Sequence, residues 1–190
     1  MKLKGSVTEK NLLKAFAGES QARNRYTFFA NVAKKEGYEQ IAAIFLETAD
    51  NEKEHAELFF KHLQGGDVEI TAAYPGGIIA GTADNLKAAA SGEKMEWTSL
   101  YPNFAGIAKE EGFAKIEETF TEIASVEAHH EERYLKLLKN IETSQVFKKP
   151  KAVQWKCRNC GNILEAKEVP DKCPVCYHDK AYFELHVENY

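Results

Sequence analysis

A glutamate three residues ahead of a histidine occurs twice in this 190-residue chain, as Glu52 with His55 and as Glu127 with His130. Residues three positions apart on a helix differ in height by about 4.5 Å and lie on neighbouring faces, so both side chains can reach one metal ion or two adjacent ions. The two pairs are 75 positions apart. Two such pairs on facing helices are a way to build a two-metal site inside a helical bundle.

The sequence around the two pairs repeats at the same offset. Phe29, Gly37, Tyr38, Ile41, Phe45 and Ala49 return as Phe104, Gly112, Phe113, Ile116, Phe120 and Ala124. Apolar residues recur at steps of three and four around residues 12–33, 41–63, 86–107 and 116–137, which is the helical period. Gly37 separates the two helices of the first half, and Gly112 separates the two helices of the second half. Each suits a helix end before a tight turn. The chain is therefore predicted to be mainly α, with a duplicated helix pair forming a four-helix bundle.

Acidic residues interrupt the apolar faces of these helices. The core-facing positions include Glu19, Glu52, Glu93, Glu96 and Glu127, together with His55 and His130. An unpaired buried carboxylate costs several kcal/mol, and Arg23 and Arg25 cannot balance five of them. A single Glu-x-x-His pair would more often lie on a solvated face, but two copies on matching stripes favour metal ligation. Carboxylate-rich ligation with two imidazoles suits iron or manganese better than zinc.

The repeat contains one insertion. Glu19 and Glu93 are 74 positions apart, whereas Tyr26 and Tyr101 are 75 apart, so the second half carries one extra residue between these points. Tyr26 and Tyr101 are candidate hydrogen-bond donors to the ligating carboxylates, and packing within the core is an equally good explanation for both.

The same comparison identifies one acidic residue that has no counterpart in the first half. At the offset of 74, Glu96 corresponds to Ala22, so the second half has a carboxylate that the first half lacks. A symmetric storage site does not need this residue. An asymmetric site in which one metal exchanges ligands could use it, and we therefore list Glu96 and His55 as candidate catalytic residues.

All four cysteines lie in the last 34 residues, as Cys157, Cys160, Cys173 and Cys176. Two C-x-x-C pairs separated by 12 residues can close a tetrahedral site around iron or zinc. A unit of fewer than roughly 40 residues rarely holds together by its core alone, so the metal is expected to stabilise its fold. The choice of metal stays open, because a zinc ribbon has similar pairs.

The remaining segments define the domain organisation. Residues 65–82 are long enough either to cross the bundle end or to run along its side. Pro102 is predicted to kink or break the third helix, because proline lacks an N–H donor. Ile141 to Lys151 is predicted to be a linker. We expect a bundle at residues 1–145 and a cysteine domain at residues 152–190.

Composition excludes several classes of protein. A formal net charge of -4 gives no reason to expect nucleic acid or an anionic membrane as a partner. No apolar run approaches the roughly 20 residues that span a bilayer, and the first residues lack the apolar region of a secretory signal. The expected location is the cytoplasm, where clustered cysteine pairs are more often metal ligands than disulfides.

Taken together, these motifs resemble the rubrerythrin family over the whole chain. The bundle is similar to its ferritin-like di-iron domain, and CRNCG with CPVC is similar to its rubredoxin-like domain. The resemblance implies that Glu52 and Glu127 bridge two irons. It further implies that Glu19 binds one iron, Glu93 and His130 bind the other, and Glu96 and His55 exchange on the first iron. Cys157, Cys160, Cys173 and Cys176 would bind a third iron, and zinc can replace iron at either site.

The resemblance also implies an activity. Members reduce hydrogen peroxide to water as peroxidases of the NADH peroxidase type, protect cells from oxidative stress, and are usually homodimers. No G-x-G-x-x-G fingerprint is present, so a separate NAD(P)H-dependent reductase or a rubredoxin would supply electrons to the cysteine-bound iron. The alternatives are a ferroxidase or iron-storage protein with a structural four-cysteine zinc ribbon, and a manganese catalase-like enzyme.

Overall fold

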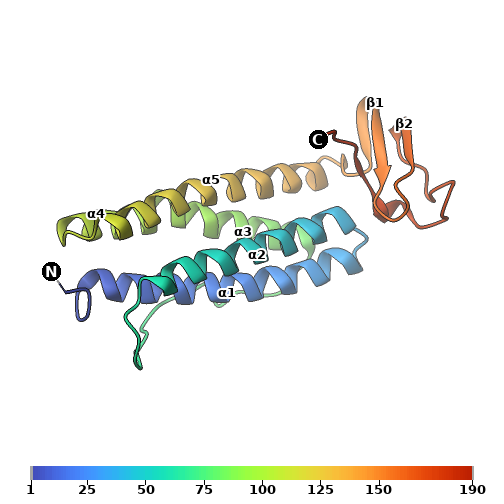
Figure 1. The fold of residues 1–190 in the computed structure, drawn as a ribbon. Helices are drawn as coiled ribbons and strands as arrows, with labels where there is room; N and C mark the ends of the chain where they lie inside the picture. The colour runs from blue at the N-terminus through green and yellow to red at the C-terminus, as the bar shows by residue number, and fades with distance from the viewer. Residues whose placement is uncertain (1, 190) are drawn as a thin grey trace.

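The computed structural model describes residues 2–189. Residues 1 and 190, which the predicted domains include, lie outside this range. The bundle consists of α1 (Val7–Lys35), α2 (Glu39–Lys61), α3 (Thr82–Met95), α4 (Tyr101–Glu110) and α5 (Ala114–Glu142) (Figure 1). A π-helical turn, η1 (Glu96–Leu100), joins α3 and α4 into one continuous helix. The predicted mainly helical, ferritin-like fold is confirmed.

Tight turns join the helices of each half, as the glycines predicted. Gly37 and Gly112 have φ values of 83° and 79°, in the left-handed region where glycine carries no steric penalty. The N–H groups of Tyr38 and Phe113 then donate to the carbonyls of Ala33 and Ala108. These bonds satisfy carbonyls that the helix ends leave free.

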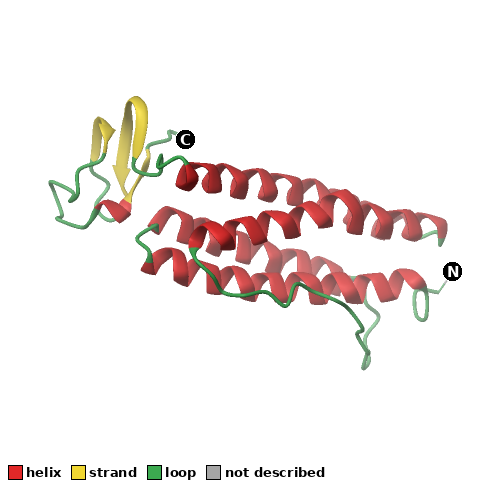
Figure 2. Cartoon of the chain, turned by 180° about the vertical axis from the view of Figure 1, so that it is seen from behind, coloured by secondary structure: helices red, strands yellow, loops and turns green. Residues whose placement is uncertain are grey.

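The segment between α2 and α3 runs along the side of the bundle, which decides between the two predicted routes. Residues 62–81 leave α2 near the start of α1 and reach α3 beside the end of α1, as the loop in Figure 2 shows. At that end the N–H of Thr82 donates to Glu36 Oε2 at 3.1 Å. One long crossover of this kind is typical of ferritin-like bundles.

Two aromatic clusters fill the bundle, and the repeat relates them. One contains Tyr26, Phe29, Phe45 and Tyr134, and the other contains Tyr101, Phe104, Phe120 and Phe59. The Phe29 and Phe45 rings lie 5.7 Å apart at 66°, and the Phe104 and Phe120 rings lie 5.5 Å apart at 66°. The duplication seen in the sequence is therefore also a duplication of packing.

The inserted residue is accommodated by η1. Its closing hydrogen bond runs from the N–H of Tyr101 to the carbonyl of Glu96, five residues back instead of four, which is how a helix absorbs one extra residue. Of the two outcomes predicted for Pro102, a kink or a break, the break is wrong, because the helix continues through this residue. Pro102 is the second residue of α4, directly after the widened turn, and the irregularity is confined to that turn.

The C-terminal unit is a small antiparallel sheet with strand order β2-β1-β3, made of β1 (Lys148–Cys157), β2 (Ile163–Glu168) and β3 (Phe183–Leu185). A 3₁₀ turn, η2 (Lys180–Tyr182), precedes β3. The predicted linker at 141–151 is too long, because α5 continues to Glu142 and β1 already begins at Lys148. Trp155 and Phe183 are fully buried in this unit beside two of its cysteines.

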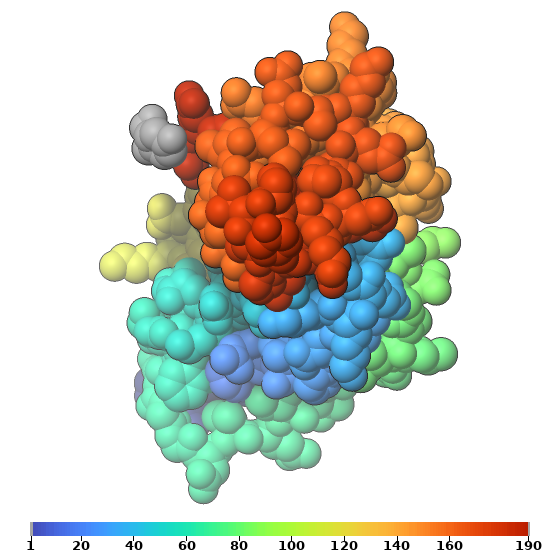
Figure 3. All heavy atoms as spheres, turned by 90° about the vertical axis from the view of Figure 1, so that its right-hand side faces the viewer, coloured from blue at the N-terminus to red at the C-terminus, as the bar shows by residue number. Residues whose placement is uncertain are grey.

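The sheet lies against one part of the bundle end and leaves the rest of that end visible, as the end-on view shows (Figure 3). Tyr38, at the α1–α2 turn, stacks on Phe147 with ring centroids 6.1 Å apart and planes 10° apart. The Nζ of Lys149 donates to Asn140 Oδ1 at 3.1 Å. These contacts tie the start of the sheet to α2 and α5. Within residues 2–189, no helix combines the length and apolar composition that crossing a bilayer requires.

Equivalent glutamates stabilise the starts of α1 and α3. Glu111 accepts hydrogen bonds from the N–H groups of Thr8 and Val7 at 2.8 and 3.2 Å, and from Thr8 Oγ1 at 2.6 Å. Glu36, which is 75 residues earlier, accepts from Thr82 in the same way. A carboxylate at a helix N-terminus pairs with otherwise free N–H groups and with the positive end of the helix dipole. The repeat therefore includes the contacts that lock each half to the other.

We expect Glu111→Ala to lower the free energy of unfolding by about 1 kcal/mol, which is about 2–4 °C in unfolding temperature for a domain of this size. The neighbouring exposed Glu110→Ala is the matched control and should change it by less than about 0.5 kcal/mol. Thermal unfolding followed by circular dichroism measures both. Equal effects in the two variants would show that the cap does not stabilise α1.

Candidate metal centre

The seven acidic and histidine side chains predicted to form a metal site meet in the middle of the bundle. Glu19 comes from α1, Glu52 and His55 from α2, Glu93 from α3, Glu96 from η1, and Glu127 and His130 from α5. Each exposes 8% of its surface or less. They lie between the two aromatic clusters, so the polar layer is enclosed by apolar packing at both ends.

Two ligand groups share two carboxylates. One consists of Glu19, Glu52, His55 and Glu127, the other of Glu52, Glu93, Glu127 and His130, and the ligand atoms of each group lie within 4.8 Å of one another. The shared carboxylates, Glu52 and Glu127, are positioned to bridge two ions. Glu96 belongs to neither group, although it is buried beside them.

Several polar atoms of the cluster lie close together without forming hydrogen bonds. His130 Nδ1 lies 2.7 Å from Glu127 Oε2 and 3.2 Å from Glu52 Oε1, yet neither contact has hydrogen-bond geometry within the described chain. Both oxygens of Glu127, Oε2 of Glu19 and Oε2 of Glu93 also lack a hydrogen-bond partner there. Buried polar atoms are rarely left unpaired, so a donor set of carboxylates and imidazoles in this state fits two metal ions.

Burial and crowding shift the pKa values of the cluster strongly. Burial, followed by the nearby Glu52 carboxylate, raises the pKa of Glu19 and Glu93 well above the ordinary value. Burial and the charges of Glu127 and Glu52 raise the pKa of Glu96 to about 8. Without cations, carboxylates this close favour their protonated forms.

The pKa values of the two histidines are raised, as expected beside carboxylates. Burial lowers the pKa of His55 and His130, but the close carboxylates of Glu127 and Glu52 outweigh it and raise the values to about 10 and 9. Burial likewise opposes ionisation of Glu52, but the two histidines hold its pKa at about 2. Protons on the imidazoles therefore supply positive charge that bound metal would otherwise supply.

Tyr26 and Tyr101 contact the cluster, in the positions predicted for hydrogen-bond donors. The hydroxyl of Tyr26 donates to Glu93 Oε1, and the hydroxyl of Tyr101 donates to Glu19 Oε1. Each bond crosses from one half of the repeat to the other. Both tyrosines also pack in the aromatic clusters, so the two roles considered for them coexist. A ligand carboxylate with one oxygen held in this way has a fixed orientation toward the metal position.

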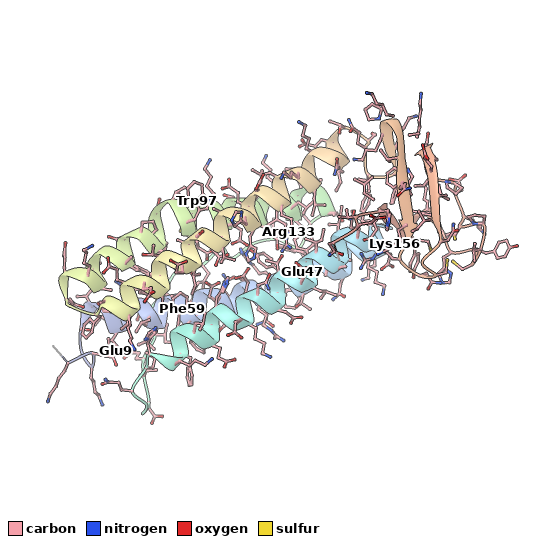
Figure 4. All side chains as sticks on the ribbon, turned by 45° about the horizontal axis from the view of Figure 1, so that its top comes forward. Glu9, Glu47, Phe59, Trp97, Arg133 and Lys156 are labelled. Atoms are coloured by element: carbon pink, nitrogen blue, oxygen red, sulfur yellow. The ribbon has the colours of Figure 1, made fainter. Side chains whose placement is uncertain are left out.

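Sequence reasoning missed an arginine beside the cluster. Arg133 on α5 donates from Nη1 to Glu47 Oε1 at 2.5 Å and from Nη2 to Thr48 Oγ1 at 2.7 Å, and Figure 4 shows Arg133 and Glu47 pointing toward each other between α5 and α2. This contact ties together the two helices that carry the Glu-x-x-His pairs. Arg133 lies three residues after His130, but its partners are 85 and 86 residues away, so local periodicity carried no signal.

The four cysteines form the second candidate site. Cys157 Sγ lies 3.8 Å from Cys176 Sγ, and Cys160 Sγ lies 3.6 Å from Cys173 Sγ. A tetrahedral site with metal–sulfur bonds of about 2.3 Å has sulfur–sulfur edges of about 3.8 Å, so the spacing fits one metal ion. Residues with positive φ, Gly161 at 77° and Tyr177 at 59°, follow the two pairs and turn the backbone around the site.

These features define a ferritin-like di-metal carboxylate protein with a rubredoxin-like tetrathiolate domain. Comparison with known proteins agrees. Residues 10–138 match the family model described as Rubrerythrin, and residues 155–184 match the model for the rubrerythrin rubredoxin-like domain. The chain is 60% identical to the rubrerythrin of Porphyromonas gingivalis over 99% of this chain and 94% of that protein. It is 56% identical to the rubrerythrin of Nitratidesulfovibrio vulgaris over 96% of each.

Solved structures give the same result. Nigerythrin in a mixed-valence state matches with a TM-score of 0.63 at 34% identity, over 96% of this chain and 87% of that one. Symerythrin from Cyanophora paradoxa matches with a TM-score of 0.64 at 25% identity, over 71% and 85%. The chain belongs to the rubrerythrin family. It is a non-haem iron oxidoreductase with two irons in the bundle and one at the tetrathiolate site.

We expect the metal-free protein to lose stability as the pH rises from about 4.5 to about 8. Because the pKa of Glu96 is about 8 in the folded state and near 4.5 in the unfolded chain, the folded protein binds more protons across this window, so its free energy of unfolding falls. His55 and His130 act in the same direction above about pH 6.5.

Unfolding temperatures of metal-free and iron-loaded protein at pH 5 and pH 8 test this. The gap between the two forms should widen toward pH 8, since iron replaces the protons. The Glu96→Gln variant, which cannot ionise at this position, should lose part of the pH dependence. A gap that stays constant across this range would contradict the electrostatic account of the cluster.

Proposed function

We propose that the protein is a peroxidase that reduces hydrogen peroxide to water as a defence against oxidative stress, with electrons relayed through its tetrathiolate iron. The observation that carries the proposal is Glu96. This carboxylate is buried beside the shared ligands but belongs to neither ligand group, and the other half of the repeat has Ala22 at this position. A site that only stored iron would have no use for one additional, unshared acid.

The placement of His55 supports a ligand exchange with Glu96. Its Nδ1 lies 2.8 Å from Glu127 Oε1 and 3.9 Å from Glu19 Oε1, so the imidazole occupies the Glu19 side of the cluster while Glu96 stands outside. Four carboxylates match the charge of two ferrous ions. Two ferric ions carry two more positive charges and favour a fifth carboxylate. We propose that Glu96 replaces His55 on this side when the site is oxidised.

The other ligands would keep their positions while Glu96 and His55 exchange. Glu52 and Glu127 are shared by both ligand groups, and the tyrosine hydroxyls fix the outer carboxylates Glu19 and Glu93. Two ferrous ions held by these residues would supply the two electrons that, with two protons, convert one hydrogen peroxide into two waters. The protein's task is to keep four carboxylates in place and to let one ligand position change.

Electrons would enter through the four cysteines. The sheet lies beyond the α1–α2 turn (Figure 1), whereas the carboxylate cluster is built from residues in the middle of the helices. This separation supports a homodimer in which the tetrathiolate iron of one chain faces the di-iron site of the other. An external NAD(P)H-dependent reductase or a rubredoxin would reduce the tetrathiolate iron. Thiolates kept free for metal binding suit a reducing compartment, and we place the protein in the cytoplasm.

We expect Glu96→Ala to lower the rate of peroxide reduction by at least about tenfold, because the oxidised site loses its fifth carboxylate. The measurement is turnover of hydrogen peroxide by iron-loaded protein with an artificial reductant, with iron content checked for each variant. Exposed Glu54→Ala, near the cluster in sequence, is the control and should retain full activity. Full activity in Glu96→Ala, with unchanged iron geometry in both oxidation states, would rule out the exchange.

Cys160→Ser separates the two halves of the proposal. This variant should stop turnover supported by a reductase, while chemically reduced protein should still be oxidised by one equivalent of peroxide. Protein that takes up iron but does not reduce peroxide under either condition would instead favour iron storage.

A further inference from the structure

A cavity lies beneath the crossover segment, next to Glu96. Its volume is about 470 Å³. Thr71 to Pro75 of the crossover form one wall, Gly18 and Gln21 of α1 form another, and Glu96 and Leu100 of η1 lie on the third side. The crossover therefore covers one side of a partly open space between α1 and the continuous α3–η1–α4 helix.

Glu96 connects this cavity to the carboxylate cluster. Of the seven acidic and histidine side chains in the cluster, it is the one that lines the cavity, and it exposes 8% of its surface compared with 0% for Glu19, Glu93 and Glu127. A molecule that reached the cluster through this cavity would therefore meet first the side chain that belongs to neither ligand group.

Gly18 keeps the cavity open. A glycine inside a helix is less favourable than alanine by about 1 kcal/mol, and neither packing nor backbone strain requires one here, because a Cβ at this position would meet no atom within 4 Å. Its equivalent in the repeat is Gly92, where a Cβ would lie 3.5 Å from Arg25 Nη2. The arginine fills the space on one side of the cluster, and the equivalent space on the Gly18 side is open.

We propose that this cavity is the route by which the substrate and other small ligands reach the carboxylate cluster, with Glu96 at its inner end. The inference rests on the proposed peroxidase function. Apolar Ala72, Pro75 and Leu100 line the cavity together with Lys14, Gln21 and Glu96, and its volume admits small ligands such as hydrogen peroxide and nitric oxide. The open space also gives Glu96 room to move toward the cluster and back.

The test uses the iron-loaded full chain and two variants that fill the cavity from different walls. Gly18→Leu adds a side chain from α1, and Ala72→Phe adds one from the crossover, where helix stability is not affected. Gly106→Leu, at an exposed glycine inside α4 with no atom within 4 Å of a Cβ, is the matched control. The first readout is the rate at which nitric oxide, a small neutral ligand of ferrous iron, binds the reduced protein in stopped flow. The second readout is the rate of oxidation by hydrogen peroxide.

We expect both cavity variants to bind nitric oxide at least about tenfold more slowly than the wild type, with iron content unchanged and with Gly106→Leu at the wild-type rate. Hydrogen peroxide oxidation should slow in parallel. Unchanged nitric oxide rates in both variants would overturn the entry site and leave the peroxidase proposal standing. Slowed nitric oxide binding in a protein that does not reduce peroxide would support the entry route and reject the peroxidase function.

Discussion

The rest of the structure depends on one constraint. Four buried carboxylates surround two adjacent metal positions in the middle of the bundle. Glu19, Glu52, Glu93 and Glu127 expose 1% of their surface or less, and their mutual repulsion in a medium of low dielectric is affordable only with cations between them. The aromatic clusters at both ends exclude water from this layer. The cross-repeat tyrosine bonds and the Arg133 contacts keep the four helices at the separation that the ions need.

The duplication builds this symmetric frame, and the chemistry that we propose depends on the place where the symmetry is broken. Packing, turns and helix caps all follow the repeat, so two equivalent halves build a nearly symmetric pair of ligand groups. The symmetry fails on one side of the cluster, where the inserted residue, the π-helical turn, Glu96 and the cavity beside Gly18 lie together. Because the extra residue is absorbed within η1, Tyr101 keeps the same kind of contact with Glu19 that Tyr26 makes with Glu93.

Local periodicity was enough to predict the helices, their buried faces and the residues that meet in the cluster, since burial of one face decides these features. It could not predict contacts between distant segments. The capping of α1 by Glu111, the bonds of Arg133 and the route of residues 62–81 depend on which elements lie side by side. The expected break at Pro102 was wrong for a related reason: the π-helical turn directly before it absorbs the inserted residue, and the helix continues as α4.

The most direct test of the central claim is a crystal structure of the reduced, iron-loaded protein with anomalous scattering measured at the iron edge. The account predicts two iron peaks within the bundle. One should be bound by Glu19, Glu52, His55 and Glu127, and the other by Glu52, Glu93, Glu127 and His130, while Glu96 binds neither. A single bundle iron, or two irons with Glu96 bound and His55 free in this reduced state, would contradict it.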